Sequence, residues 1–365
     1  MLPQSAHDDV ARQQFVIALK QGLNRSIRAT NKRLFEEVVA PDAEARTGAV
    51  PNDRDSIRTA MYSHPAYRSW STLHRSAQEL MWRSVADVVA RDSDRLQQQA
   101  ARLTRPAKQR GSLELDSTVQ APRGVANLDI HLQTGGYMLD RNPEDVAAGV
   151  LYEVGGNLYA FGQGLGKNDS KAAHVQRFLA DKFPALQPKR ILDMGCSAGS
   201  ASVPYALEFP GAEVHAIDVA PGMLRYAHAR AESLGAAVHF HQRDAADTGF
   251  PDEHFDLIVS HNMMHEIPDS TRRGMLRETW RMLAPGGVAV HQDVPLQFAG
   301  LSEFQKFELS WDTLNNNEPY WEVYASADLG ADARGAGIPD EHVYVGNLPA
   351  ATQSLPWFVT VITKP

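Results

Sequence analysis

The second half of the chain alternates short hydrophobic runs with amphipathic segments, and this alternation constrains the fold more than any other feature. The runs are rich in Val, Ile and Leu, as strands are: RILDMG, EVHAIDV, VHFHQRD, FDLIVSHN and GVAVHQDV. Intervening segments such as PGMLRYAHARAESLG repeat their apolar residues at helical spacing. Strands of this kind, joined by helices, form a parallel sheet covered on both faces. We therefore predict an α/β fold with a Rossmann-like, seven-stranded, mostly parallel sheet, closed by an antiparallel pair, HVYVGN and PWFVTVI.

The first part of the chain has a helical pattern instead. Apolar residues recur at intervals of three, four or seven over residues 9–40 and again over 64–103, which predicts two long amphipathic helices. Pro41 is expected to end the first helix, and Pro65 suits the first turn of the second.

The pattern changes near residues 110 and 165, and a chain of 365 residues exceeds one ordinary core. LELDSTV and LDIHLQ alternate like short strands, whereas TGGY, VGGN and GQGLG are typical of turns. The predicted organisation has three parts: a helical domain that covers substrate or mediates dimerisation (1–110), a connector with short strands (111–165), and the sheet domain with an aromatic insertion at about 300–326 (166–365).

Composition excludes several classes of protein. Apolar residues make up 43% and charged residues 22% of the chain, as in ordinary globular proteins, and no run is long enough to span a bilayer. The formal charge of −8 disfavours nucleic acid as a partner. Cys196 is the single cysteine, so no internal disulfide can form, and the N-terminal residues lack the pattern of a signal peptide. We expect a cytoplasmic protein.

Acidic residues follow three successive strands of the predicted sheet. Asp193 begins the turn DMGCSAG, in which Gly195 and Gly199 let a ligand approach the backbone, and Asp218 and Asp244 end the next two strands. Open α/β sheets bind ligands at this edge, where a carboxylate can accept both ribose hydroxyl protons. An acidic crevice suits a cationic sulfonium better than a pyrophosphate, which disfavours NAD.

Residues from about 165 to 365 resemble the class I S-adenosylmethionine-dependent methyltransferases of the small-molecule type. The matching stretches are LDMGCSAG, VHAIDVAPGML, FHQRDAADTGFPDEHFDLIVSHNMMHEIP and WRMLAPGGV. The resemblance implies methyl transfer from S-adenosylmethionine to a small molecule. It also implies a set of cofactor contacts: Asp193, Gly195 and Gly199 at the methionine part, Asp218 with Val219 at the ribose, Asp244 and Ala245 at the adenine, and His261 and Asn262 near the sulfonium.

His265 and Glu266 follow the fourth of these strands, where the methyl group would point. They resemble the catalytic pair of small-molecule O-methyltransferases, which implies that His265 deprotonates a hydroxyl and that Glu266 orients the His265 ring. His265 can equally be a pocket wall, and Glu266 a helix cap. The leading interpretation includes no metal. An alternative is C-methylation of a keto acid with a rim metal held by a different set: His261, His265, His291 and Asp293.

Two further alternatives stay open: a lyase or cyclase that uses S-adenosylmethionine without methyl transfer, and a non-enzymatic scaffold. The insertion carries aromatic residues that either form a lid over the acceptor or pack the helical domain onto the sheet: Phe304, Phe307, Trp311, Tyr320, Trp321 and Tyr324. Tyr152, Tyr159 and Phe161 can close over the cofactor. The long N-terminal helices can also form a homodimer interface.

Overall fold

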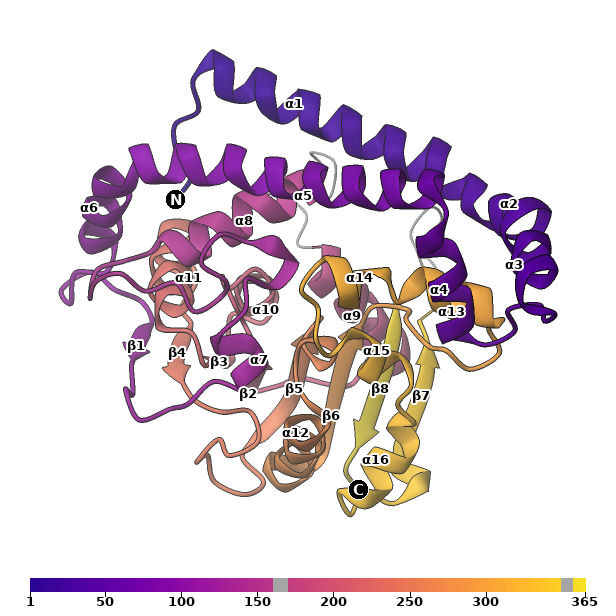
Figure 1. The fold of residues 1–365 in the computed structure, drawn as a ribbon. Helices are drawn as coiled ribbons and strands as arrows, with labels where there is room; N and C mark the ends of the chain where they lie inside the picture. Colours follow the sequence, from indigo (N-terminus) through magenta and orange to yellow (C-terminus); the bar gives the residue numbers. More distant parts are fainter. Residues whose placement is uncertain (160–169, 349–356) are drawn as a thin grey trace.

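The computed structural model describes residues 1–159, 170–348 and 357–365. Within these ranges one sheet of eight strands runs in the order β1-β4-β3-β2-β5-β6-β8-β7 (Figure 1). The strands are β1 (Ser112–Glu114), β2 (Arg190–Met194), β3 (Glu213–Asp218), β4 (His239–Gln242), β5 (Phe255–His261), β6 (Leu283–Asp293), β7 (Val343–Asn347) and β8 (Phe358–Thr363). All neighbours pair in parallel except β8, which is antiparallel to β6 and β7. The predicted Rossmann-like sheet with its antiparallel closing pair is confirmed, and β1 extends it at the β4 edge.

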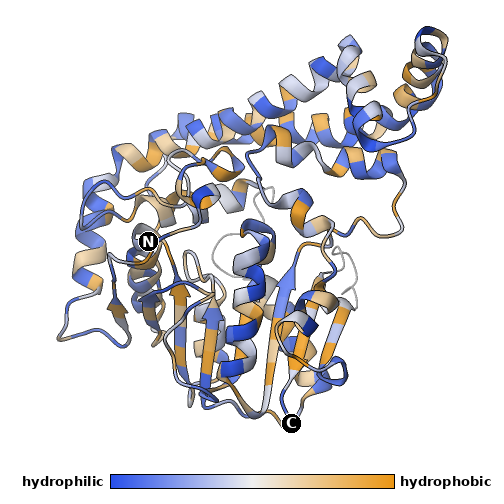
Figure 2. Cartoon of the chain, turned by 60° about the horizontal axis from the view of Figure 1, so that its bottom comes forward, coloured by the Kyte–Doolittle hydropathy of each residue, from blue (hydrophilic) through white to orange (hydrophobic). Residues whose placement is uncertain are grey.

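Helices cover both faces of the sheet because its strands are hydrophobic on both sides, as Ile191 and Leu192 of β2 illustrate. One face packs against α9 (Ser170–Lys182), α10 (Ser202–Glu208) and α11 (Pro221–Leu234). The other packs against α12 (Asp269–Met282), α15 (Trp321–Ala325) and α16 (Leu329–Gly335). Hydrophobic stretches run along the strands and are interrupted by hydrophilic residues (Figure 2).

The N-terminal residues form a nearly continuous helical path across one end of the sheet (Figure 1). The path runs through α1 (His7–Gly22), a π-helical turn (Leu23–Ile27), a 3₁₀ turn (Arg28–Thr30), α2 (Asn31–Leu34), a second π-helical turn (Phe35–Val39) and α3 (Ala40–Thr47). The prediction that Pro41 ends this helix is wrong. Pro41 lies in the first turn of α3, where its missing N–H is harmless, and Gly48 ends the helix at φ 78°.

The second predicted helix is two helices, α5 (Pro65–Arg91) and α6 (Ser93–Leu103), with a break at Asp92. Pro65 lies in the first turn of α5, as predicted. Asp92 accepts hydrogen bonds from the backbone of Gln4 and from Arg95 at the break. A short helix, α4 (Arg54–Ser63), precedes α5 and is capped by Asp53. Among the described residues no helix is both long and hydrophobic enough to cross a membrane.

The connector differs from the prediction at two places. LDIHLQ is not a strand: it forms a 3₁₀ turn, η4 (Ile130–Leu132), in which His131 and Leu132 have φ of 57° and 61°. VGGN is not a turn, because it belongs to the helix α8 (Ala147–Tyr159). The glycines of α8 permit close packing: a Cβ on Gly155 would lie 2.2 Å from the Trp82 ring of α5. Phe161 and the GQGLG segment lie outside the described residues.

The insertion after β6 contains α13 (Glu303–Leu309), α14 (Trp311–Asn315) and α15. Phe304, Phe307 and Trp311 are buried in one cluster with Tyr67 and Trp70 of α5. These three side chains therefore pack the insertion against the N-terminal helices, which is the second of the two alternatives considered for them.

Candidate active site

A cavity with about 810 Å³ of empty space, its open mouth included, lies at the carboxyl ends of β2, β3, β4 and β5. This is the edge at which open α/β sheets bind ligands. Its walls come from several segments: Gly195 and Ser197 after β2, Asp218 and Val219 at β3, Asp244 and Ala245 after β4, His261, Asn262 and Glu266 after β5, and Tyr137 and Tyr152 from the connector.

The turn after β2 is tied to the neighbouring strand by backbone hydrogen bonds. The N–H groups of Gly195 and Cys196 both donate to the carbonyl of Ile217, at 2.9 Å. Gly195 has φ of 70°, and a Cβ there would lie 2.5 Å from the Met263 sulfur. Gly199 also has a positive φ, 72°, but it does not line the cavity and packs near Ala227 of α11. The turn therefore places Gly195, and not Gly199, at the cavity.

Of the three predicted carboxylates, two line the cavity and one does not. Asp218 and Asp244 line the cavity, whereas Asp193 is 1% exposed and lies beneath it, where it accepts a hydrogen bond of 2.6 Å from Ser202 Oγ. Asp244 accepts from the backbone N–H of Ala246 at 2.8 Å. The acidic border of the cavity is thus made by two of the three residues.

Asp218 is held rigidly at the end of β3. Its Oδ2 accepts from the N–H of Ser197 and its Oδ1 from the N–H of Ala220, both at 2.9 Å. Burial raises the pKa of this carboxyl, while the backbone hydrogen bonds act in the opposite direction. Each oxygen keeps a second lone pair that can accept a ligand hydroxyl. His261 lines the same cavity, and its Nε2 lies 3.1 Å from the Tyr205 hydroxyl.

His265 and Glu266 are adjacent but lie differently with respect to the cavity. Glu266 lines it, whereas His265 is 3% exposed and does not. The Nδ1 of His265 lies 2.5 Å from Asp293 Oδ1, and its Nε2 lies 3.5 Å from Glu266 Oε1. Burial lowers the pKa of His265, but Asp293 and Glu266 outweigh this effect and hold it well above its ordinary value.

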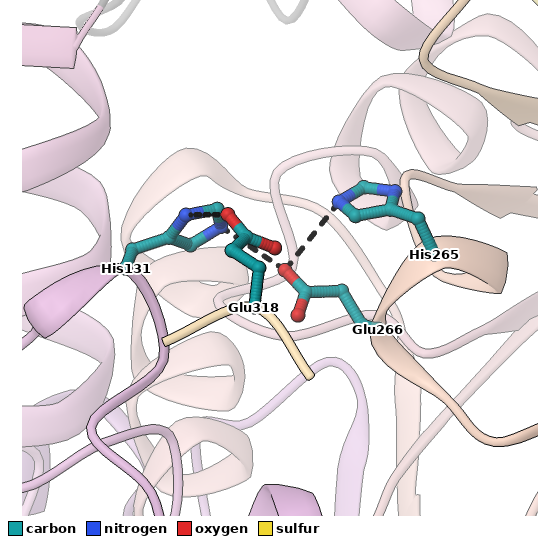
Figure 3. A group of neighbouring side chains, drawn as sticks. All are labelled: His131, His265, Glu266 and Glu318. Carbon is teal, nitrogen blue, oxygen red and sulfur yellow. Dashed lines mark hydrogen bonds and ion pairs between the residues drawn. The ribbon is translucent and has the colours of Figure 1, made fainter. Parts of the chain in front are cut away.

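Three residues not predicted from the sequence converge on Glu266. The Nε2 of His131 lies 3.0 Å from Glu266 Oε1, and the Tyr137 hydroxyl donates to the same oxygen at 2.9 Å. The Nδ1 of His131 lies 2.5 Å from Glu318 Oε1. Figure 3 shows His131, His265, Glu266 and Glu318 pointing toward one common space. They come from η4, from the turn after β5 and from the loop between α14 and α15.

This buried cluster, which we call the His-Glu cluster (His131, His265, Glu266 and Glu318), has strongly interacting charges. Burial raises the pKa of Glu266, but His131 and His265 outweigh it, so the pKa of this carboxyl is lowered. Burial dominates at Glu318, whose pKa is raised. No motif in the sequence indicated His131 or Glu318, because they lie in irregular segments far from Glu266 along the chain.

The alternative metal set on the rim of the sheet does not form. His291 is buried with its ring nitrogens 2.9 Å from Ser260 Oγ and 3.1 Å from Thr279 Oγ1. Asp293 contacts the His265 ring instead. The interpretation that His291 and Asp293 join His261 and His265 around one ion is therefore wrong, because hydroxyl groups already occupy both His291 nitrogens.

Most residues of the aromatic insertion also lie away from this cavity. The Trp321 ring is 5.3 Å from the His265 ring, edge to face, and its Nε1 donates to the Leu309 carbonyl at 2.8 Å. The Tyr320 hydroxyl accepts from the N–H of Gly124 at 3.2 Å. Tyr324 is fully buried. Trp321 thus packs behind the His-Glu cluster.

The sheet order and the position of the cavity define a Rossmann-like, nucleotide-binding type of α/β domain. Residues 191–287 match the methyltransferase domain family, and this stretch contains β2 to β5 and the turns that line the cavity. They form a domain of the class I S-adenosylmethionine-dependent methyltransferases.

Two curated relatives each match about a third of the chain. A demethylmenaquinone methyltransferase of Thermus thermophilus is 38% identical over 108 residues, 30% of this chain and 48% of the relative. A trans-aconitate 2-methyltransferase of Methylobacterium radiotolerans is 35% identical over 124 residues, 34% of this chain and 45% of the relative. The chain spans about half the length of these relatives.

Among solved structures, phosphoethanolamine N-methyltransferase 2 of Haemonchus contortus, in complex with S-adenosyl-L-methionine, is 20% identical with a TM-score of 0.45. The match covers 63% of this chain and 60% of that one.

Proposed function

We propose that the protein transfers a methyl group from S-adenosylmethionine to a small-molecule acceptor, most simply to a hydroxyl oxygen. The observation that carries this proposal is one continuous cavity with a different chemistry at each end. Asp218 and Asp244 border the end next to β3 and β4, and Glu266 of the His-Glu cluster borders the end next to β5.

The residues of the first end fit an adenosyl ligand. Both oxygens of Asp218 are fixed by backbone N–H groups and keep lone pairs for the two ribose hydroxyls. Asp244, Ala245 and His261 line the same cavity, and we assign the first two to the adenine edge and His261 to the sulfonium. When bound, S-adenosylmethionine supplies an electrophilic methyl group with a good leaving group. The protein then has to align the acceptor and remove its proton.

At the second end, Glu266 is the group that can contact an acceptor hydroxyl. We propose that the proton leaves to the Glu266 carboxylate, while the His265 ring, oriented by Asp293, lies behind this carboxylate with its Nε2 3.5 Å from Oε1. The acceptor is a small molecule because Tyr137 and Tyr152 restrict the cavity on the connector side. A homodimer through the N-terminal helices stays a prediction, which light scattering can test.

Product analysis tests the proposed function. The protein is incubated with S-adenosylmethionine and a panel of hydroxylated small molecules, and mass spectrometry follows the products. We expect S-adenosylhomocysteine and a methylated acceptor in equal amounts, and a rate lowered about 10²- to 10⁴-fold in Glu266→Gln. Methylthioadenosine without methylated product would instead identify a lyase or cyclase. A product methylated at carbon would support the keto-acid alternative.

A further inference from the structure

We propose that His131, His265, Glu266 and Glu318 bind a single divalent transition-metal ion beside the cavity, which Glu266 lines. Each residue offers one ligand atom, and the four atoms lie within 4.8 Å of one another. Ligand atoms around a tetrahedral zinc ion lie about 3.3 Å apart, so small rotations of these side chains suffice to enclose an ion. Two imidazoles and two carboxylates suit ions of intermediate softness, such as Fe²⁺, Co²⁺ and Zn²⁺.

A supporting residue orients one of the ligands. Metal-binding histidines usually donate their second ring N–H to a carboxylate, which fixes the tautomer. Asp293 stands in this position, since its Oδ1 is 2.5 Å from His265 Nδ1. Its other oxygen accepts from the backbone N–H of Met264 at 2.8 Å. Asp293 therefore directs the Nε2 of His265 toward the cluster.

Two carboxylate oxygens of the cluster have no hydrogen-bond partner among the residues that the structure describes. They are Glu266 Oε2 and Glu318 Oε2, and the Glu318 side chain is only 2% exposed. A buried carboxylate oxygen without a partner is costly, and a cation bound between the two side chains would remove this cost. The absence of partners for these two oxygens within the described part of the chain is an observation separate from the distances that define the cluster.

The backbone of His131 also points to a ligand. His131 and Leu132 both adopt the left-handed region, which costs a non-glycine residue roughly 1–2 kcal/mol. This conformation places the His131 ring between Glu266 and Glu318. Strained residues of this kind cluster at ligand sites, where the binding energy can offset the strain.

A network of ion pairs without metal is the competing explanation. In that case both imidazoles are protonated and balance the carboxylates. Buried pairs of this type contribute little net stability, because desolvation opposes the Coulomb attraction. A metal ion gives the same charge balance and also satisfies the oxygens that the imidazoles do not reach. The two explanations differ in a measurable quantity, the stoichiometry of metal uptake.

An oxygen of the acceptor would add to the ion as a fifth ligand from the side of Glu266, which faces the cavity. This part of the inference rests on the proposed function and deepens it. An acceptor hydroxyl bound to the ion would lose its proton more readily than one in water, and the proton would pass to water at the open mouth of the cavity, because the ion occupies the ligand atoms of Glu266 and His265. The acceptor class is then a small molecule with an ionisable hydroxyl or a chelating pair of oxygens.

Titration of the full-length, tag-free protein with Co²⁺ tests the site, because bound Co²⁺ has visible absorption bands that report its coordination. We expect uptake of about one ion per chain in the wild type and loss of the bands in Glu318→Gln and His131→Ala. Asp293→Asn, which removes the supporting carboxylate, should weaken the affinity about 10- to 100-fold. His254→Asn, a half-buried histidine outside the cavity, is the matched control and should bind as the wild type does.

Two results would overturn the metal site: no stoichiometric uptake by the wild type, or unchanged uptake in folded Glu318→Gln and His131→Ala. Circular dichroism establishes the fold of each variant, and the wild-type stoichiometry is decisive even where a variant does not fold. Calorimetry with S-adenosylhomocysteine separates the two proposals. Cofactor-product binding without metal uptake removes the metal site alone, whereas metal uptake without such binding removes the proposed methyl transfer.

Discussion

Asp218→Asn tests whether the end of β3 binds the ribose of the cofactor. The substitution keeps the size of the side chain but removes its charge and one acceptor oxygen. In the wild type, the carboxylate accepts hydrogen bonds from the N–H groups of Ser197 and Ala220. In the variant, the amide NH₂ of the asparagine must therefore face one of these two donors. At the ligand, one hydrogen bond to a charged acceptor is lost, which costs about 1.5–3 kcal/mol. That loss corresponds to roughly 10- to 150-fold weaker binding.

Isothermal titration calorimetry with S-adenosylhomocysteine measures this change. Asp247→Asn is the matched control, because Asp247 follows the neighbouring strand β4 but is exposed and does not line the cavity. The dissociation constant of the control should equal that of the wild type. Thermal unfolding of both variants shows whether the fold is intact. If Asp218→Asn binds within twofold of the wild type, Asp218 does not contact the ribose and the cofactor placement is wrong.

Three further predictions concern packing and pH. Trp311→Ala should lower the free energy of unfolding by about 3–5 kcal/mol in urea titrations, because Trp311 packs on His74 with ring centroids 4.5 Å apart. The affinity for the cofactor product should stay unchanged. A selective loss of acceptor binding would instead support the interpretation of the insertion as a lid. Gly155→Ala should cost about 1–3 kcal/mol in the same assay, since its Cβ would meet the Trp82 ring, whereas Gly156→Ala, with open space around it, should not. Burial lowers the pKa of His291 to about 3, whereas a histidine in the unfolded chain has a pKa of about 6.5. Between these two pH values only the unfolded chain binds the proton. The free energy of unfolding therefore falls as the pH is lowered through this range, by up to about 1.4 kcal/mol per pH unit. His291→Asn should reduce that slope in urea titrations at several pH values, and an unchanged slope would contradict the assigned pKa.

The sheet could be predicted because each of its strands carries a local signal. The strand β5, for example, reads as a hydrophobic run bounded by polar residues, and it is buried at almost every position. The antiparallel pair β7 and β8 was also correct. β1 was expected only as a short strand of the connector. Its pairing with β4 depends on a register that no local pattern encodes.

Glycine and proline account for the main errors in the helical parts. Both residues usually mark turns, but their effect depends on where they lie in a helix. Pro41 is tolerated because it falls in a first turn. Gly149 and Gly155 are tolerated in α8 because the Tyr226 and Trp82 rings occupy the space that a Cβ would fill. A single sequence cannot distinguish a glycine that breaks a helix from one that lets another helix approach.

For a related reason, some of the residues in and around the cavity could be predicted from the sequence and others could not. Residues such as Asp218 and Ala245 directly follow strands, so the topology of the sheet alone brings them together. His131 contacts Glu266 at the cavity wall, and Glu318 contacts His131; both come from irregular segments, and their positions depend on how the connector and the insertion pack. The sequence therefore predicted the residues that line the cavity at the ends of β3 and β4, and it missed half of the His-Glu cluster.

This difference has a consequence for how the protein determines its acceptor. The segment that matches the methyltransferase domain family, residues 191–287, supplies the end of the cavity that we propose binds the cofactor, together with His265 and Glu266. His131, Tyr137 and Glu318 lie outside it, yet two of them contact the same oxygen of Glu266. A shared domain can thus keep one cofactor while the segments around it change the acceptor. Substitutions at His131 or Glu318 should accordingly alter acceptor turnover while the affinity for S-adenosylhomocysteine stays the same, and a parallel loss of both would show that the two ends of the cavity are not independent.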